Sequence, residues 1–129
     1  MAVLAEYDAV AGRPLRGGPS ATPADFAPPR GAYVVGFVEG LAACGGGVKD
    51  LGHAAAELKR MYVVPRFRGF GLGRALLGAL ETTARDLGYE RVRLDSQAAT
   101  WQLYASSGYS EIADYNANPH ADHWGEKVL

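Results

Sequence analysis

The chain has 129 residues, of which 48% are hydrophobic and 21% charged, and this size and composition fit one globular domain with a single core. The formal net charge of −1 excludes a broad basic surface for nucleic acid or an anionic membrane. The single cysteine excludes an internal disulfide framework and a zinc site built from several cysteines. Since no apolar run reaches about 18 residues and the first residues lack a basic leader, we expect a cytoplasmic protein. The abundance of Ala, Gly and Arg suggests a bacterial origin.

Residues 1–31 are expected to form a helical and then irregular segment in front of a core at residues 33–129, all within one domain. Residues 1–10 carry apolar side chains at helical spacing, whereas the stretch that follows is dense in glycine and proline. Thr22 and Pro23 are typical of the N-cap and first position of a helical turn. Two interpretations stay open for this segment, a mobile linker or a loop over a binding cleft.

The core is predicted to have the order β-β-β-α-β-α-β-β, from runs of β-branched and aromatic residues and from helical apolar spacing. A helix that connects the third and fourth strands implies that these two are parallel, with a right-handed crossover. The fold class is therefore α+β, with a mixed, mostly antiparallel sheet and flanking helices around a central parallel pair. The predicted strands span residues 33–38, 41–48, 55–64, 91–95, 110–114 and 122–128, and the predicted helices span 72–87 and 98–107.

Three glycines spaced by two, within residues 69–73, join the third strand to the helix that follows. Glycine lets the backbone take a positive φ and come close to a bound group. The first amides of a helix lack intrahelical partners, and the helix dipole adds partial positive charge at the same end. Together with Arg66, Arg68 and Arg74, these features favour binding of an anion such as phosphate. A tight turn without a ligand is the alternative.

Two common phosphate-binding motifs do not match this loop. A Walker A loop requires Lys-Ser/Thr directly after its glycines, and none follows here. In the dinucleotide fingerprint the third glycine would come one residue later, and a convincing acidic residue about 20 positions further on is missing. The pattern that fits is Arg-x-x-Gly-x-Gly at Arg68, Gly71 and Gly73. It resembles the coenzyme A pyrophosphate loop of the GNAT N-acetyltransferase superfamily.

Three further stretches resemble the same superfamily. Residues 57–63 are similar to its fourth strand, residues 101–109 to its Leu-Tyr-x-x-x-Gly-Phe/Tyr helix, and residues 124–129 to its Glu-Lys-x-Leu final strand. The resemblance covers residues 33–129 and implies the GNAT (acyl-CoA N-acyltransferase) fold. Two features depart from the family pattern. The first strand is missing or very short, and Gln97 stands where the family often has Asn.

The resemblance implies an acetyl-CoA-dependent N-acetyltransferase, with acetyl-CoA as co-substrate and without a metal. The acetyl group would pass to a primary amine of a small molecule or peptide by direct attack in a ternary complex. Main-chain groups around residues 61–63 would pair with the pantetheine arm, one amide there would polarise the thioester carbonyl, and loop amides would hold the pyrophosphate. The expected cofactor-contacting residues are Met61, Tyr62, Val63, Arg68, Gly69, Phe70, Gly71, Leu72, Gly73, Arg74, Gln97 and Tyr104.

Glu57 and Tyr104 are the predicted catalytic residues. An extended strand rises about 3.3 Å per residue, so Glu57 lies about 20 Å from Val63, the right order for the cofactor arm. Glu57 is the candidate general base, acting directly or through a water; the alternative is a solvent-facing carboxylate paired with Lys59 or Arg60. The resemblance implies that Tyr104 is the general acid for the leaving thiolate. The alternative for Tyr104 is core packing with a satisfied hydroxyl.

The last hairpin loop is the expected border of the acceptor site. His120 and His123, with Asp114, Asn116 and Asp122, could contact a polar or cationic acceptor, and the alternative is that the histidines are surface residues. Their spacing does not indicate a metal site. The class of amine acceptor is left open, and pairing of an incomplete sheet edge would permit a homodimer. The second functional hypothesis is a catalytically weak acyl-CoA-binding or regulatory module of the same fold.

Overall fold

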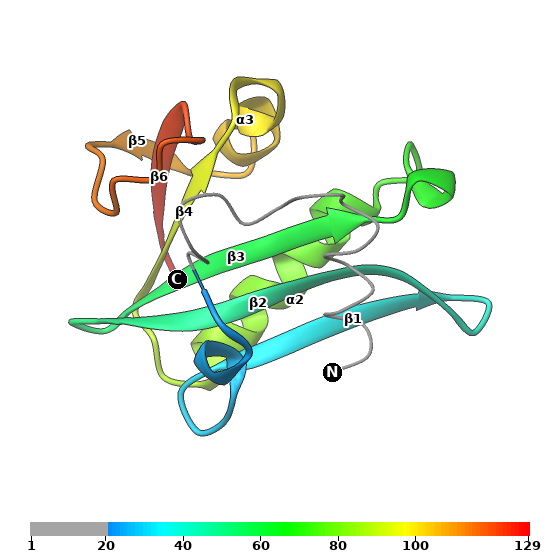
Figure 1. Cartoon of the computed structure of the whole chain (residues 1–129), viewed down its shortest axis with the longest axis horizontal. Helices are drawn as coiled ribbons and strands as arrows, with labels where there is room; N and C mark the ends of the chain where they lie inside the picture. The colour runs from blue at the N-terminus through cyan, green and yellow to red at the C-terminus, as the bar shows by residue number, and fades with distance from the viewer. Residues whose placement is uncertain (1–20) are drawn as a thin grey trace.

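The computed structural model describes residues 21–129, and the helix predicted at residues 1–10 lies outside them. One six-stranded sheet runs through the described chain in the order β1-β2-β3-β4-β6-β5 (Figure 1). β3 and β4 are parallel, and the other neighbouring strands are antiparallel. The strands are β1 (Ala32–Val38), β2 (Leu41–Gly52), β3 (Ala55–Val63), β4 (Arg91–Ser96), β5 (Ser110–Ile112) and β6 (His123–Val128), the α-helices α2 (Leu72–Asp86) and α3 (Ala98–Ala105), and the 3₁₀ turns η1 (Pro23–Phe26) and η2 (Pro65–Phe67).

This architecture confirms the predicted order of elements and the central parallel pair. The second strand is longer than predicted, because it continues from residue 48 to Gly52 before the chain turns. Gly52, His53 and Ala54 all have positive φ, so the reversal to β3 occurs there. The missing or very short first strand concerns the residues before Tyr33. Residues 1–20 lie outside the described part, and residues 21–31 form η1 and turns without a strand. Within residues 21–129, neither helix has the length and apolar character needed to cross a membrane.

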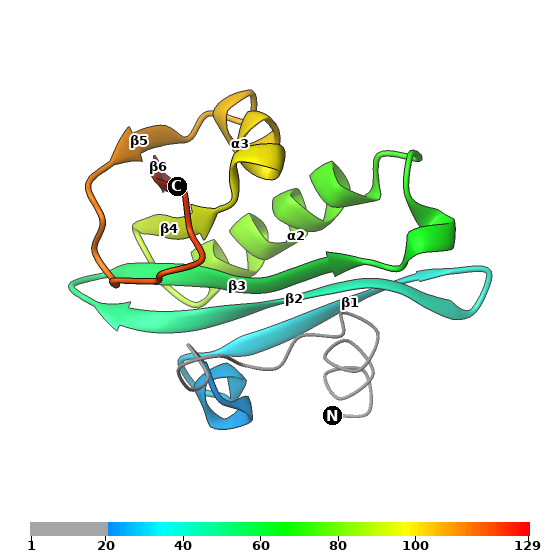
Figure 2. The same cartoon turned by 45° about the horizontal axis from the view of Figure 1, so that its top comes forward.

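The main core lies between α2 and one face of the sheet (Figure 2). Leu76, Leu77 and Leu80 of α2 are almost completely buried and belong to one cluster with the inward side chains of β2, β3 and β4. Burying a leucine side chain contributes about 1.5–3 kcal/mol, so this stripe is a main source of stability. Leu58 of β3 and Leu94 of β4 point into this cluster, and their odd-numbered neighbours therefore point to the opposite face.

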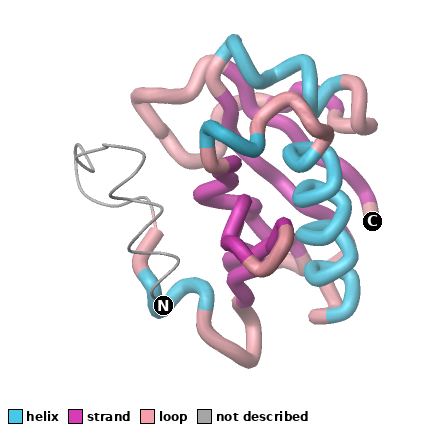
Figure 3. Tube along the Cα trace, turned by 90° about the vertical axis from the view of Figure 1, so that its right-hand side faces the viewer, coloured by secondary structure: helices cyan, strands magenta, loops and turns pink. Residues whose placement is uncertain are grey.

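The opposite face of β1 and β2 is covered by η1 (Figure 3). The turn predicted at Thr22 and Pro23 is confirmed, and the Thr22 amide donates a hydrogen bond of 2.8 Å to the Asp25 carboxylate. Phe26 lies against Gly47 so closely that a Cβ at Gly47 would be 2.3 Å from the ring. The Phe26 ring occupies the space that a side chain at position 47 would need, so packing requires glycine there. β2 continues through this glycine.

β3 and β4 pair over only three residues and then separate. The parallel register joins Ala55–Glu57 to Arg91–Arg93. From there, within the described chain, β3 continues to Val63 and β4 to Ser96 without further pairing between them. Figure 1 shows β4 turning away from β3 toward α3. We call the space between the two strands beyond Glu57 and Arg93 the fork.

A β-bulge in the ladder between β2 and β3 interrupts the part of β3 that borders the fork. Lys59 pairs with Gly47 and Tyr62 pairs with Gly45, so Arg60 and Met61 together oppose the single residue between these glycines. Arg60 has a positive φ of 57°, an uncommon conformation for a residue with a side chain. Bulges bend a strand, increase its twist and redirect its main-chain groups, and they are frequent next to active sites.

Candidate active site

The glycine loop leads from β3 to the first turn of α2, as the sequence predicts. Gly69 and Gly71 have φ values of 87° and 79°, and a Cβ at either would meet nothing within 4 Å. Backbone conformation rather than space therefore requires glycine at both positions. Gly71 is the N-cap of α2 and brings no side chain to occupy the first amides. These amides keep their capacity to bind an anion.

Two arginines beside this loop have contacts that fix their direction. The Arg68 Nε donates a hydrogen bond of 2.9 Å to the Val63 carbonyl, so this side chain folds back on the end of β3. The Arg74 guanidinium donates to the hydroxyls of Ser107 and Ser106, at 2.9 and 3.1 Å. Arg74 therefore ties the start of α2 to the end of α3, and both cations stay near the loop. The neighbouring Phe70 side chain is 78% exposed.

Tyr104 lies on α3 and is 9% exposed. Its hydroxyl is 3.6 Å from the Met61 Sδ, which places it beside the bulge of β3. A thioether is a weak hydrogen-bond acceptor, so the hydroxyl can turn to a better partner. Burial, and then the negative charge of Asp95, raise the pKa of Tyr104 to about 12. The phenol therefore holds its proton throughout the neutral range. Both alternatives raised by the sequence, packing and chemistry, are compatible with this position.

Gln97, the other cofactor candidate near α3, is the N-cap residue of this helix. Its side chain is exposed, and its carbonyl accepts a hydrogen bond from the Thr100 amide at 3.1 Å. The structure thus brings Gln97, Tyr104 and the end of β4 to the same end of the fork, opposite Met61 on β3. The predicted cofactor-contacting residues follow the fork and the glycine loop continuously.

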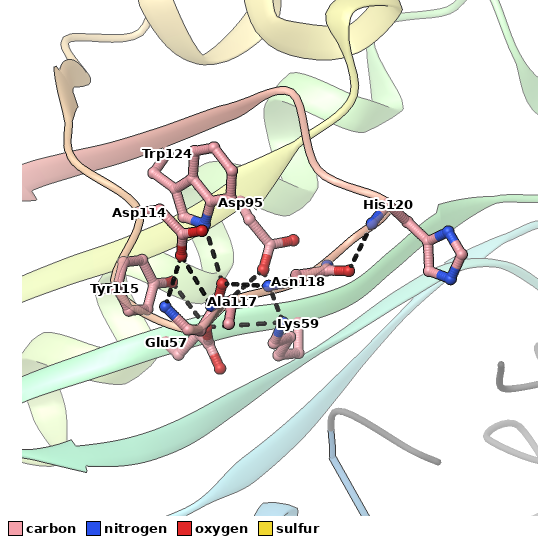
Figure 4. A network of polar contacts seen from close by, with 10 residues as sticks. Glu57, Lys59, Asp95, Asp114, Tyr115, Ala117, Asn118, His120 and Trp124 are labelled. Carbon is pink, nitrogen blue, oxygen red and sulfur yellow. Dashed lines mark hydrogen bonds and ion pairs between the residues drawn. The ribbon is translucent and has the colours of Figure 1, made fainter. Parts of the chain in front are cut away.

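Glu57 lies on the face of the sheet opposite α2, at the closed end of the fork (Figure 4). Its side chain is 2% exposed, so the solvent-facing position in the alternative is wrong, whereas the pairing with Lys59 in the same alternative is confirmed. Its Oε2 accepts hydrogen bonds from the Tyr115 hydroxyl at 2.6 Å and the Asn116 amide at 3.0 Å, and it lies 3.5 Å from the Lys59 Nζ. Burial and then the charge of Glu57 raise the pKa of Tyr115. Tyr115 is therefore a permanent donor to this carboxylate at neutral pH.

Asp95 of β4 joins the same network from across the fork. The Lys59 ammonium lies 2.9 Å from the Asp95 carboxylate, and the Asn116 amide donates to the same oxygen. Burial raises the pKa of Asp95, but the charge of Lys59 and hydrogen bonds from Lys59, Asn116 and Asn118 outweigh it, so the pKa lies below its usual value. Asp95 is therefore ionised at neutral pH.

The loop from β5 to β6 carries the amide that joins these groups. The Asn116 Oδ1 accepts from the Trp124 Nε1 at 2.8 Å and from the Asn118 amide at 3.2 Å, while its Nδ2 reaches both Glu57 and Asp95. One side chain thus connects β3, β4, β6 and its own loop. The sequence indicated Asn116 as an acceptor contact but did not assign Lys59, Asp95 or Tyr115 to the site. Strand alternation places Lys59 on the same face as Glu57, a signal that could have found it.

The two histidines of the last hairpin lie in different surroundings. His120 is exposed, and its amide donates to the Asn118 side chain at 3.0 Å. His123 instead stacks on Trp101, with ring centres 5.0 Å apart, and lies 2.6 Å from the Glu111 carboxylate. Among the described residues, no three metal-binding side chains gather at one point. His120 therefore stays beside the fork, whereas His123 belongs to the packing of α3 on β6.

The family described as "Acetyltransferase (GNAT) family" matches residues 8–109 of the chain. The chain belongs to this family. A relative from Escherichia coli (strain K12), named as the uncharacterized N-acetyltransferase YjgM, is 33% identical over 96 residues. The match covers 70% of this chain and 57% of YjgM, so the chain spans little more than half the length of this relative. Family membership confirms the resemblance inferred from the sequence motifs.

Solved structures of GNAT proteins have the same fold. A Klebsiella pneumoniae protein assigned as an acyl-CoA N-acyltransferase is 27% identical, with a TM-score of 0.71 over 99% of this chain and 88% of its own. A Mycobacterium tuberculosis protein, Rv2747, is 20% identical, with a TM-score of 0.65 over 75% of each chain, and its structure contains CoA. The α+β GNAT fold with a parallel β3–β4 pair is thus confirmed for this chain.

Proposed function

We propose that the protein is an N-acetyltransferase that transfers the acetyl group of acetyl-CoA to a primary amine by direct attack in a ternary complex. The observation that carries this proposal is the fork, where β3 has separated from β4 and a bulge at Arg60–Met61 lies beside the Tyr104 hydroxyl. The membership of the chain in an acetyltransferase family supports the proposal. As predicted from the sequence, we place the reaction in the cytoplasm, and the acceptor amine on a small molecule or peptide.

The residues of the fork and loop fit a long cofactor with an anionic end. Loop amides from Arg68 to Arg74 would hold the pyrophosphate, because glycine at 71 leaves the first amides of α2 without side-chain caps. The part of β3 around Met61–Val63, beyond its pairing with β4, would pair with the pantetheine arm as an added strand does.

Bound acetyl-CoA supplies an acetyl group already activated as a thioester. A main-chain amide at the bulge of β3 would donate to the developing oxyanion, since a bulge redirects the main-chain groups of its strand. Tyr104 keeps its proton at neutral pH, and its hydroxyl contacts a weak acceptor, the Met61 Sδ, so it can donate to the leaving thiolate. Both catalytic groups lie on the same stretch of the fork.

Glu57 retains the role of general base in this proposal through a relay. Its 2% exposure and its three close partners leave little room for direct contact with an amine. The proton of the acceptor would therefore reach this carboxylate through a water or a neighbouring polar group, the second of the two routes expected from the sequence.

The test is a calorimetric titration of the full chain with acetyl-CoA, desulfo-CoA and ATP, followed by measurement of thiol release with a panel of primary amines. Binding of both CoA species but not of ATP, with amine-dependent thiol release, is the expected result. CoA binding without thiol release from any amine would favour the acyl-CoA-binding module instead. If neither CoA species binds, the proposed function is wrong.

A further inference from the structure

Arg60 has a backbone conformation that is unusual for its place in the fold. Residues 21–129 contain five non-glycine residues with a positive φ, and four of them lie in turns or loops. Arg60 is the one that lies inside a strand, with a φ of 57° within β3. A left-handed conformation is unfavourable for a residue with a side chain, so it persists only where the surrounding structure holds it. Contacts around the bulge must therefore hold Arg60 in place.

Contacts on both faces of the sheet fix the bulge. On the face of α2, the Met61 side chain packs against Gly46, where an added Cβ would lie 3.2 Å from the Met61 Cγ and 2.9 Å from a Leu80 methyl carbon. On the other face, the Arg60 guanidinium donates a hydrogen bond of 2.7 Å to the Ala21 carbonyl. The two residues of the bulge are thus held from opposite sides of the sheet.

The Ala21 carbonyl belongs to a packed part of the fold. Ala21 is 2% exposed and forms a small cluster with Phe26 and Tyr33, on the side of the sheet where η1 lies (Figure 2). The Phe26 ring in turn fills the space beside Gly47, which pairs with β3 next to the bulge. The acceptor of the Arg60 hydrogen bond is therefore anchored. A hydrogen bond from a charged group is strong enough to offset the cost of one left-handed residue.

We propose that Arg60 is a positioning residue, and that its hydrogen bond to Ala21 holds the bulge in the conformation that presents a main-chain amide to the thioester carbonyl. This inference rests on the proposed acetyl transfer and adds to it a residue that acts through the backbone. Without the hydrogen bond, a side chain at position 60 favours a negative φ, and this change reorients the peptide groups of the bulge. The segment around η1 thereby contributes to polarisation of the carbonyl from across the sheet.

The test uses the full chain saturated with acetyl-CoA that carries ¹³C at the thioester carbonyl, observed by NMR. A hydrogen bond to this carbonyl withdraws electron density from its carbon and moves the resonance downfield, so the shift reports polarisation without an acceptor amine. The variants are Arg60→Ala and Arg60→Gly, which both remove the guanidinium but differ in their tolerance of a positive φ. Arg85→Ala, at an exposed position in the last turn of α2, is the control. Calorimetry gives the acetyl-CoA affinity of each protein.

We expect acetyl-CoA bound to the wild type to resonate downfield of free acetyl-CoA, and Arg85→Ala to keep this shift. Arg60→Ala should lose most of the shift, while its acetyl-CoA affinity stays within about threefold of the wild type because the glycine loop is intact. Arg60→Gly should retain more of the shift than Arg60→Ala, since glycine adopts a positive φ without a steric cost.

Four results would overturn the inference: no downfield shift in the wild type, an unchanged shift in Arg60→Ala, equal shifts in the two variants at position 60, or loss of acetyl-CoA binding in Arg60→Ala. The last result would show that Arg60 supports cofactor binding as a whole. If the wild type does not bind acetyl-CoA, the proposed function itself is wrong.

Discussion

Replacing Lys59 by methionine tests whether the network at the fork stabilises the fold. Lys59 is 6% exposed and is the ammonium that stands between Glu57 and Asp95, at 3.5 and 2.9 Å. Methionine keeps much of the side-chain length but leaves two buried carboxylates facing each other without a cation. Breaking a buried ion pair from one side lowers the free energy of unfolding by about 3–5 kcal/mol. We expect a loss of this size for Lys59→Met at neutral pH.

The loss should depend on pH in a defined direction. The pKa of Asp95 is lowered in the folded protein, mainly by Lys59 against the effect of burial. Its contribution to stability is therefore complete well above the unfolded pKa, about 3.9, and is lost as the pH falls through the lower folded pKa. In Lys59→Met this contribution is missing at neutral pH. The difference in unfolding free energy between the two proteins should therefore shrink below about pH 4.

The assay is urea unfolding of wild type, Lys59→Met and Lys127→Met at neutral and acidic pH. Lys127 also pairs with a carboxylate, that of Glu81 at 3.1 Å, but its side chain is 30% exposed. Partly exposed pairs contribute about 1 kcal/mol or less, so the same substitution should have a much smaller effect there. The reasoning is refuted if both variants lose similar stability, or if the loss in Lys59→Met does not change with pH.

Three further predictions concern Tyr104, the proposed general acid, and the glycines. Tyr104→Phe should lower turnover about 100-fold or more while acetyl-CoA affinity, measured by calorimetry, stays unchanged; a large loss of affinity would show that the residue is structural. Gly71→Ala forces a side chain into a φ of 79°, which costs about 1–2 kcal/mol, and we expect it to weaken desulfo-CoA binding. The control is Gly78→Ala, at a position inside α2 where an added Cβ would meet nothing within 4 Å. It should leave desulfo-CoA binding intact and raise the melting temperature. Gly47→Ala places a Cβ 2.3 Å from the Phe26 ring, so we expect a loss of about 1–3 kcal/mol by thermal unfolding; an unchanged melting temperature would show that η1 moves aside freely.

Features that depend on residues close together in the sequence were predictable from the sequence. The glycine loop is one example, because Gly71 must supply a positive φ just before α2, and sequence spacing alone reveals this requirement. The buried stripe of α2 is another, since helical periodicity places Leu76 and Leu80 on one face. The parallel pair followed from the helix between two strands, because such a crossover leaves few alternatives. The end of β2 was misplaced, since Lys49 and Asp50, predicted as part of a turn, instead pair with Glu57 and Ala56 of β3.

The polar network could not be predicted, because its members are distant in the chain. Alternation along a strand places Glu57 and Lys59 on one face, but it cannot say what covers that face. Tyr115 and Asn116 cover it, and they lie 58 and 59 positions from Glu57 in the sequence. The shortest contact of the Lys59 ammonium is with Asp95, which lies 36 positions away. Local backbone geometry and periodicity are properties of short stretches, so the sequence by itself determined the loop, the helices and the family. Burial and charge pairing depend on which distant segments meet, so only the tertiary structure decided that the fork ends in a buried carboxylate network.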